Sequence, residues 1–204
     1  MHETELRDRY RPPSELVLRK QLDHLDPGSQ GFIAASPFFV LATASAGGVD
    51  ASPRGGPPGF VAVLDEHRLA FGDLAGNNRL DSYANIANSA AVGLLFFVPG
   101  VEETLRVNGV ASITEDPTVL AVTAIQDRRP KVAVEVTVSE CFVHCGKAVR
   151  RGGLWDAATW PASEDRPSAA AIFTDQLQLG VDPAVVAADL EAGYRATLWE
   201  HGGT

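Results

Sequence analysis

The sequence predicts a mainly β protein, a small antiparallel barrel with peripheral helices. Apolar runs rich in β-branched residues recur as pairs joined by short turns, and helical segments fall between the pairs. This order of strand, strand, helix, strand, strand differs from the alternation of strand and helix that is typical of a parallel α/β sheet. The chain fits a single domain over residues 1–204, with a helical extension at 1–29 and helices at 168–204.

The N-terminal extension contains the first expected helix, at residues 14–24. Ser14 is a natural N-cap, and leucines repeat along one side of the segment. Asp-Pro-Gly at 26–28 is expected to end this helix. A short turn over 29–35 then leads into the first strand.

The extended segments have continuous or alternating apolar residues between turn-forming residues. They are expected over residues 38–43, 49–52, 60–64, 68–71, 91–98, 104–114 and 132–144. Grouped as hairpins, these segments give five or six strands. Helices are expected over residues 77–88, 117–126 and 168–200, and a long surface loop over 152–168.

The acidic balance of the chain limits its partners. The formal net charge is -9 and the isoelectric point is about 5.0. Nucleic acids and anionic membranes both attract clustered Lys and Arg, so the charge argues against both as partners. The polar N-terminal stretch has no apolar core of a secretory signal, and no apolar run is long enough to span a bilayer. With two cysteines, Cys141 and Cys145, a disulfide framework is excluded and a cytoplasmic location is expected.

Gly76-Asn77-Asn78-Arg79 stands where a strand gives way to an expected helix. The free N–H groups and partial positive charge of a helix start suit an anion, and Asn77 or Asn78 can cap it. Arg79 in the first turn opposes the helix dipole unless an anion lies beside it. A bound phosphate would remove this conflict. The alternative is a capped helix with Arg79 in water.

A second candidate site follows a strand, in the sequence Ser-Pro-Arg-Gly-Gly at 52–56. Gly55 allows a ligand to approach the backbone closely, and Arg54 offers a second contact to phosphate. The alternative is a Gly/Pro-rich turn with a solvated arginine.

A third candidate is the polar stripe of Thr104, Arg106 and Asn108. On an alternating strand these three side chains share one face. This face is either the wall of a pocket or the solvent side of the sheet.

The segment from Cys141 to Lys147 suggests a metal site at first, but its Cys-x3-Cys spacing is unusual for zinc and no second ligand cluster exists. No metal is therefore expected, and both cysteines are interpreted as small buried hydrophobes. Lys147 is able to reach a ligand, and Trp155 to stack on a flat ring, although tryptophan more often packs in a core or interface. No Ser-His-Asp or Cys-His set is present, so no catalytic residue is assigned and a cofactor is expected to carry the chemistry.

Taken in order, several motifs resemble those of the pyridoxamine 5′-phosphate oxidase-related flavin-binding proteins. The motifs cover residues 37–43, 50–56, 69–79, 92–96 and 104–109. The closing segments 141–147 and 153–155 are similar to one subgroup, known as probable FMN-dependent enzymes.

The resemblance implies a six-stranded antiparallel split β-barrel that forms a homodimer with two FMN sites at the interface. It implies redox chemistry on a small-molecule substrate. At matching positions it implies Arg54 beside the flavin phosphate, and Asn78 with Arg79 where the family has a basic pair on that phosphate. Thr104 matches a residue that reaches the isoalloxazine edge, often from the partner subunit, and Arg106 is expected nearby.

The acidic C-terminal helix does not match the Arg- and Trp-containing segment of the true pyridoxamine-phosphate oxidases, so vitamin B6 is not the expected substrate. Two alternatives to an FMN-dependent oxidoreductase stay open. One is a non-catalytic, flavin-binding dimer module. The other is the same fold with the deazaflavin F420 or haem as its ligand.

Overall fold

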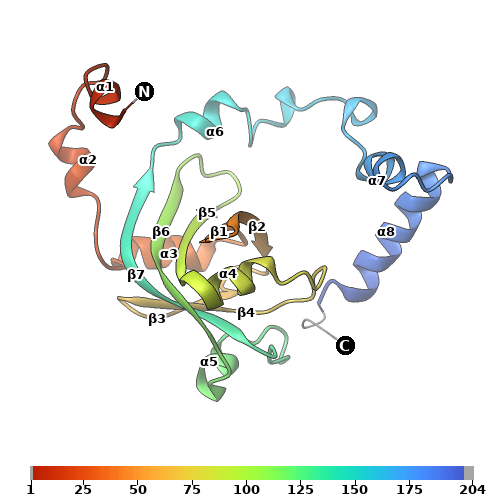
Figure 1. Cartoon of the computed structure of the whole chain (residues 1–204), viewed down its shortest axis with the longest axis horizontal. Coiled ribbons are helices and arrows are strands. Elements are labelled where there is room, and N and C mark those ends of the chain that lie inside the picture. Colours follow the sequence, from red (N-terminus) through yellow and green to blue (C-terminus); the bar gives the residue numbers. More distant parts are fainter. Residues whose placement is uncertain (1, 200–204) are drawn as a thin grey trace.

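The computed structural model describes residues 2–199 and contains one antiparallel sheet surrounded by helices (Figure 1). Residue 1 and residues 200–204, the end of the expected C-terminal helices, lie outside the described residues. The strands are β1 (Phe38–Ser45), β2 (Gly48–Gly55), β3 (Val61–Asp65), β4 (Arg68–Gly72), β5 (Ala91–Phe97), β6 (Thr104–Thr114) and β7 (Ala133–His144). The expectation of a mainly antiparallel sheet with peripheral helices is confirmed.

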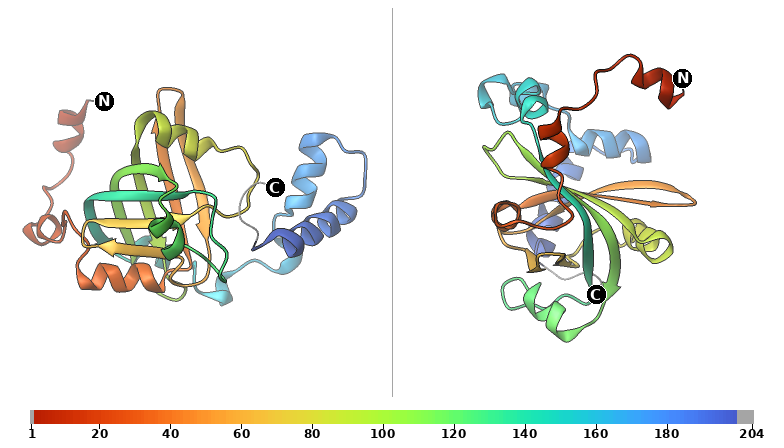
Figure 2. Two further views of the ribbon diagram at one scale, coloured as in Figure 1. Left: turned by 90° about the horizontal axis from the view of Figure 1, so that it is seen from below. Right: turned by 90° about the vertical axis from the view of Figure 1, so that its left-hand side faces the viewer.

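The sheet has seven strands, in the order β2-β1-β5-β6-β7-β4-β3, where at most six were expected. Each of the seven predicted extended segments forms a strand of its own, so their grouping into five or six strands was wrong, and the first hairpin, β1 with β2, is longer than predicted. Its pairing runs without a break from Phe38 opposite Gly55 to Ser45 opposite Gly48. The hydrogen-bonded ladder ends at β2 and at β3, so the described sheet is twisted and open instead of a closed barrel (Figure 2).

The helices are α1 (Glu3–Arg7), α2 (Glu15–Arg19), α3 (Pro27–Ala35), α4 (Asp81–Ser89), α5 (Pro117–Val122), α6 (Lys147–Arg151), α7 (Ala169–Leu177) and α8 (Pro183–Thr197). The prediction of a turn at 29–35 was wrong, because Asp26-Pro27-Gly28 begins helix α3 instead of ending a helix. The Ser29 N–H donates to the Asp26 carboxylate at 3.0 Å, and Pro27 occupies the first turn, where its missing N–H has no cost.

Aromatic side chains fill the inner face of the sheet. The ring centroid of Phe39 lies 5.0 Å from those of both Phe71 and Phe96. Helix α4 packs on β1 and inserts the buried Ile86 into the same core. This packing fixes the start of α4 opposite the end of β2, which creates the candidate site.

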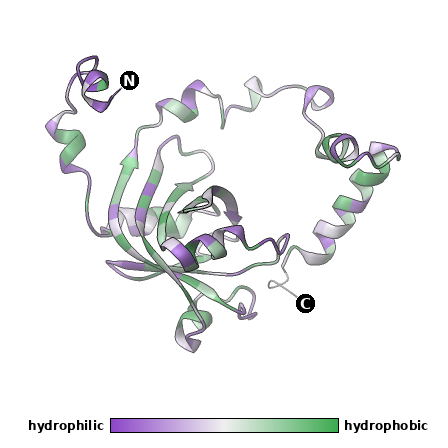
Figure 3. Cartoon of the chain, in the orientation of Figure 1, coloured by the Kyte–Doolittle hydropathy of each residue, from purple (hydrophilic) through white to green (hydrophobic). Residues whose placement is uncertain are grey.

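The two ends of the chain extend away from the sheet, with α1 and α2 on one side and α7 and α8 on the other (Figure 1). Both ends carry hydrophobic stretches (Figure 3). No helix within residues 2–199 has the length and apolar character that a membrane crossing requires. Of the two cysteines expected to be buried, Cys141 is buried in β7, whereas Cys145 lies just beyond the strand and is exposed.

Candidate functional site

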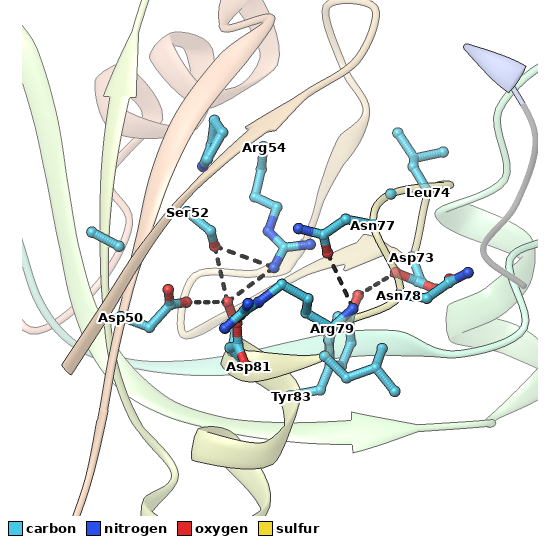
Figure 4. Close-up of a pocket in the computed structure, with 15 residues that line it drawn as sticks. Asp50, Ser52, Arg54, Asp73, Leu74, Asn77, Asn78, Arg79, Asp81 and Tyr83 are labelled. Atoms are coloured by element: carbon cyan, nitrogen blue, oxygen red, sulfur yellow. Dashed lines mark hydrogen bonds and ion pairs between the residues drawn. The ribbon is translucent and has the colours of Figure 1, made fainter. Parts of the chain in front are cut away.

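A cavity of about 290 Å³ lies between β2, the 73–80 segment and the first turn of α4 (Figure 4). Its lining is mainly polar and comprises Asp50, Ala51, Ser52, Pro53, Arg54, Asp73, Leu74, Gly76, Asn77, Asn78, Arg79, Leu80, Asp81, Ser82 and Tyr83. Asn77, Asn78 and Arg79 from one predicted motif therefore lie in the same cavity as Arg54 from another.

Arg54 is held firmly at the end of β2. Its Nη2 donates to Ser52 Oγ at 3.2 Å and to Ser82 Oγ at 3.1 Å, and its guanidinium lies over the ring of Tyr83. Its Nε is buried and has no hydrogen-bond partner among the residues that the structure describes. A buried donor left unpaired costs about 1–3 kcal/mol. The arginine is therefore fixed in place with one donor left unsatisfied.

The two serines connect Arg54 to Asp50. Ser82 Oγ donates to Asp50 Oδ2 at 2.6 Å, so its single proton is used there. Ser52 Oγ, 2.9 Å away, is then the donor in the Ser52–Ser82 bond. Asp50, Ser52 and Arg54 alternate along β2 and share the side that faces α4 (Figure 4). Asp50 thus lies close enough to offset part of the charge of Arg54.

Tyr83 closes the inner side of the cavity. Its hydroxyl donates to Asp73 Oδ1 at 2.7 Å. Burial, together with this bond to a carboxylate, raises the pKa of the Tyr83 phenol well above its usual value of 10.0. The phenol is therefore a neutral hydrogen-bond donor at physiological pH.

The helix beside Arg79 starts later than predicted. It was expected from residue 77, but it begins at Asp81, after Asn78 and Leu80 adopt left-handed backbone conformations with φ of 56° and 59°. Two such residues cannot continue a right-handed helix. Asn77 does not cap it either; its side chain accepts the Arg79 N–H at 3.1 Å in a local turn. The N-cap is Leu80, which makes no side-chain capping bond.

Arg79 already has an anion beside it. Its Nε lies 2.7 Å from Asp81 Oδ2, and this carboxylate raises the pKa of the arginine. Asp81 stands in the first turn of α4, where a negative charge is favourable. The expected conflict between Arg79 and the helix dipole is thus relieved by the protein itself.

A second cavity of about 160 Å³ adjoins the first and shares Pro53, Arg54, Leu74 and Gly76 with it. Its other lining residues are Gly55, Phe60, Phe71, Gly72 and Ala75, which are apolar or small. The Arg54 side chain therefore borders a polar space and an apolar space. Polar and apolar binding surfaces thus lie side by side at Arg54.

Thr104 and Arg106 do not reach these cavities within the chain. Across the sheet, Arg54 pairs with Phe39, Phe39 with Phe96, and Phe96 with Leu105. Directly paired residues share a face, so the neighbours of Leu105 in sequence, Thr104 and Arg106, point to the opposite face.

On that opposite face Arg106 has its own surroundings. Its guanidinium pairs with Glu140 and lies 4.3 Å from the ring centroid of Phe142. As with Arg54, its Nε is buried and lacks a hydrogen-bond partner within residues 2–199.

Lys147 and Trp155 lie elsewhere again, around α6. They line two other cavities, of about 210 and 330 Å³, next to the β5–β6 connection. Trp155 Nε1 donates to the carbonyl of Val101 at 2.8 Å, which anchors the chain after α6 to that connection. Of the nine predicted cofactor residues, the cavities beside Arg54 bring together Arg54, Gly55, Asn77, Asn78 and Arg79.

Several lining residues were not predicted. Asp50 and Ser52 alternate with Arg54 along β2, so the period-two pattern of a strand could have placed them on the same face as Arg54. Ser82 and Tyr83 become visible as site residues only when the helix start is moved to Asp81. Asp73 is brought in by its bond to Tyr83, which no sequence pattern indicates.

Comparison with known proteins gives a family for the part of the chain that forms the sheet. The family model described as pyridoxamine 5′-phosphate oxidase matches residues 25–145. A search of the curated proteins found no match.

Three solved structures are among those that match part of this chain. A putative pyridoxamine 5′-phosphate oxidase from Lactobacillus delbrueckii is 25% identical, with 60% of this chain and 98% of that chain covered and a TM-score of 0.44. HupZ of Group A Streptococcus is 15% identical, with 58% and 92% covered and a TM-score of 0.47. An FMN-binding protein from Syntrophomonas wolfei is 11% identical, with 70% and 91% covered and a TM-score of 0.45.

Proposed function

Because this chain belongs to the pyridoxamine 5′-phosphate oxidase family, we propose that it binds flavin mononucleotide in the two cavities beside Arg54. The observation that carries the proposal is the state of Arg54, whose guanidinium is held by two serines while its buried Nε lacks a partner. A phosphate group is the kind of anion that a fixed guanidinium recognises.

The residues around the polar cavity fit the phosphate end of the ligand. Arg54 supplies guanidinium donors, and the first turn of α4, which no side chain caps, supplies backbone N–H groups. Arg79 adds further donors to the phosphate once its guanidinium leaves the carboxylate of Asp81 and pairs with the phosphate instead. The Arg79 and Asp81 side chains are 71% and 48% exposed, and such surface pairs are worth about 0–1 kcal/mol. The exchange therefore costs little.

The apolar cavity fits the other end of the ligand. Phe60, Phe71 and Leu74 line it, and such surfaces favour a flat, largely apolar ring. Bound FMN supplies hydride or electron transfer at its isoalloxazine ring. The task of the chain is to position that ring and to exclude water from it.

The face that carries Thr104 and Arg106 supports a homodimer. Within one chain this face points away from the cavities. A homodimer that sets this face against the cavities of the other protomer brings Thr104 and Arg106 to the flavin. The Arg106 side chain is 37% exposed, so part of its guanidinium would then face a ligand bound to the partner.

We favour a flavin-dependent oxidoreductase acting on a small molecule, and one observation supports a second candidate. Within residues 2–199, the lining of the two cavities beside Arg54 contains no histidine, cysteine or lysine, and its tyrosine stays protonated. The described lining thus offers no imidazole, thiol or amine for acid–base chemistry. A non-catalytic flavin-binding module fits that lining equally well.

The ligand is tested by the visible spectrum of the purified protein and by titration with FMN, F420 and haemin. Binding of FMN with a characteristic flavin spectrum supports the proposal, whereas preference for F420 or haemin contradicts it. Mixing the FMN-loaded protein with NADH or NADPH separates the two candidates, because an oxidoreductase that uses these donors loses the oxidised-flavin absorbance. A flavin that stays oxidised with both donors favours the non-catalytic module.

A further inference from the structure

Two segments at the ends of the chain leave apolar side chains uncovered. We call residues 2–21, which include α1 and α2, the N-terminal arm, and residues 168–199, which include α7 and α8, the C-terminal arm. The two arms lie on opposite sides of the sheet (Figure 1). They therefore do not cover each other within one chain.

The C-terminal arm packs chiefly on itself. Helices α7 and α8 contact each other, and the arm meets the sheet region where Arg128 donates to the carbonyl of Trp199 at 3.3 Å. A groove of about 440 Å³ runs along α8, lined mainly by Leu179, Val186, Leu190 and Tyr194. The large hydrophobic residues that the arm exposes are Ile172, Phe173, Leu177, Leu179, Val181, Val185, Tyr194, Leu198 and Trp199. A patch of this extent is typical of an interaction surface.

The N-terminal arm has the same character. It is attached to the sheet at its end, where Leu22 pairs with Cys141 and Lys20 donates to the carbonyl of Val143. The large hydrophobic residues that it exposes are Leu6, Tyr10, Leu16, Val17 and Leu18. No residue of α1 or α2 is buried in the chain.

The exposed area of the chain also points to a partner. Its accessible surface is 13,060 Å². A compact monomer of 21.6 kDa exposes about 9,200 Å² by the usual scaling with mass. The excess is on the order of 3,900 Å², more than the roughly 1,000–2,500 Å² that each protomer of an obligate dimer buries. A second copy of the chain that covers both arms would remove a large part of this excess.

The arms are complementary in charge. Over its whole length the N-terminal arm carries five basic and four acidic residues, but the stretch around α2, residues 9–20, carries Arg9, Arg11, Arg19 and Lys20 against one acid, Glu15. The C-terminal arm carries Asp175, Asp182, Asp189 and Glu191 against one base, Arg195. Opposite charges around apolar surfaces orient two partners and speed their association.

We propose that the C-terminal arm of one chain packs on the N-terminal arm of a second copy, and reciprocally. A two-fold axis can bring the C-terminal arm of each protomer against the N-terminal arm of the other. Both contacts then form at once, and the assembly closes as a dimer. This contact shares with the proposed function the expectation of a homodimer, and it does not depend on the flavin.

The test uses the full-length protein and light scattering after size exclusion, with sedimentation to measure the dimer dissociation constant. The C-terminal variant is L179D/Y194D, which puts charge on two exposed side chains of the groove. The N-terminal variant is L16D/L18D. The matched control is A188D/A192D, which adds the same charge to α8 at exposed alanines away from the groove.

We expect a wild-type mass of twice 21.6 kDa, a dissociation constant raised about tenfold or more in each arm variant, and little change in the control. Because the two arms touch each other, the variant with all four substitutions should dimerise no more weakly than whichever arm variant dimerises less strongly. Circular dichroism should show unchanged helix content in the variants.

Four outcomes overturn the proposal. The first is a monomeric wild type, which leaves the arms for a different protein, and the second is a pair of arm variants that dimerise as the wild type does. The third is a control variant whose dimer is weakened as much as those of the arm variants. The fourth is full additivity of the two arm variants in the free energy of dimerisation. A wild-type dimer that fails to bind FMN instead contradicts the proposed function and leaves the arm contact intact.

Discussion

The guanidinium of Arg54 lies over the ring of Tyr83, with its central carbon 5.5 Å from the ring centroid. Arg54 comes from the end of β2 and Tyr83 from the first turn of α4, so this contact joins the two walls of the candidate cavity (Figure 4). Tyr83 is itself held by its hydrogen bond to Asp73. The cavity is therefore formed before any ligand enters, and a ligand does not have to order the arginine.

Substitution of Arg54 should weaken flavin binding. We expect Arg54→Ala to reduce FMN affinity by about 1–3 kcal/mol, because charge-assisted hydrogen bonds to phosphate are lost. Arg54→Lys should recover little of this loss, since lysine lacks the fork that contacts Ser52 and Ser82. Fluorescence titration with FMN measures the effect. Arg195→Ala, in α8, is the control, and equal affinity in the Arg54 and Arg195 variants would remove Arg54 from the site.

Substitution of Arg79 and substitution of Asp81 should change the affinity for FMN in opposite directions. Arg79→Ala should weaken FMN binding, most strongly at low salt, because an attractive charge is lost. Asp81→Asn should strengthen binding several-fold, since Arg79 is then free and a negative charge leaves the cavity. The titration is repeated at low and high salt. Weaker binding by Asp81→Asn would show that the carboxylate helps to form the site instead of competing with the ligand.

The strands and the cluster around Arg54 were accessible from the sequence, because both depend on local signals. Apolar runs between turn residues indicate strands, and glycine beside Arg54 or asparagine beside Arg79 indicates where a strand or helix ends. The start of α4 was not accessible in this way. Asn77, Asn78 and Asp81 are all acceptable near a helix start, and the left-handed turn that selects among them is not determined by local preference.

The grouping of Thr104 and Arg106 with Arg54 shows a second limit. Alternation establishes that Thr104 and Arg106 share a face, but it does not say which face lies towards the cavity. That depends on the pairing of four strands across the sheet, from β2 to β6. Register of this kind is set by non-local contacts, which no short motif encodes.

His144 should make the stability of the protein depend on pH. Burial, and then the nearby positive charges of Arg106 and Lys20, lower the pKa of His144 below its usual value of 6.5. Below pH 6.5 the unfolded chain takes up a proton at this position before the folded chain does, so the contribution of His144 to stability is lost as pH falls from about 6.5 towards its folded pKa. His144→Gln should remove this part of the pH dependence.

Urea unfolding at several pH values between 5 and 7.5 measures the His144 effect. The informative quantity is the difference in the free energy of unfolding between the wild type and His144→Gln. The wild type alone is not enough, because Asp23 raises the pKa of His24, whose effect on stability therefore runs the other way with pH. The difference should grow in favour of the wild type as pH rises through 6.5. A difference that is constant over this range would contradict the prediction.

Gly109 should tolerate no side chain. It follows the register shift between β6 and β7 at Asn108 and Gly109, and a Cβ atom there would collide with the carbonyl oxygen of Thr137 on the paired strand. Gly109→Ala should therefore lower the free energy of unfolding by at least about 1–3 kcal/mol, as overpacking against the backbone does. Gly93→Ala is the matched control on the neighbouring strand β5, where the nearest atom is the movable amide oxygen of Asn108 at 3.2 Å. If both variants unfold at the same urea concentration, the backbone at the register shift rearranges to accept a Cβ atom more easily than the structure indicates.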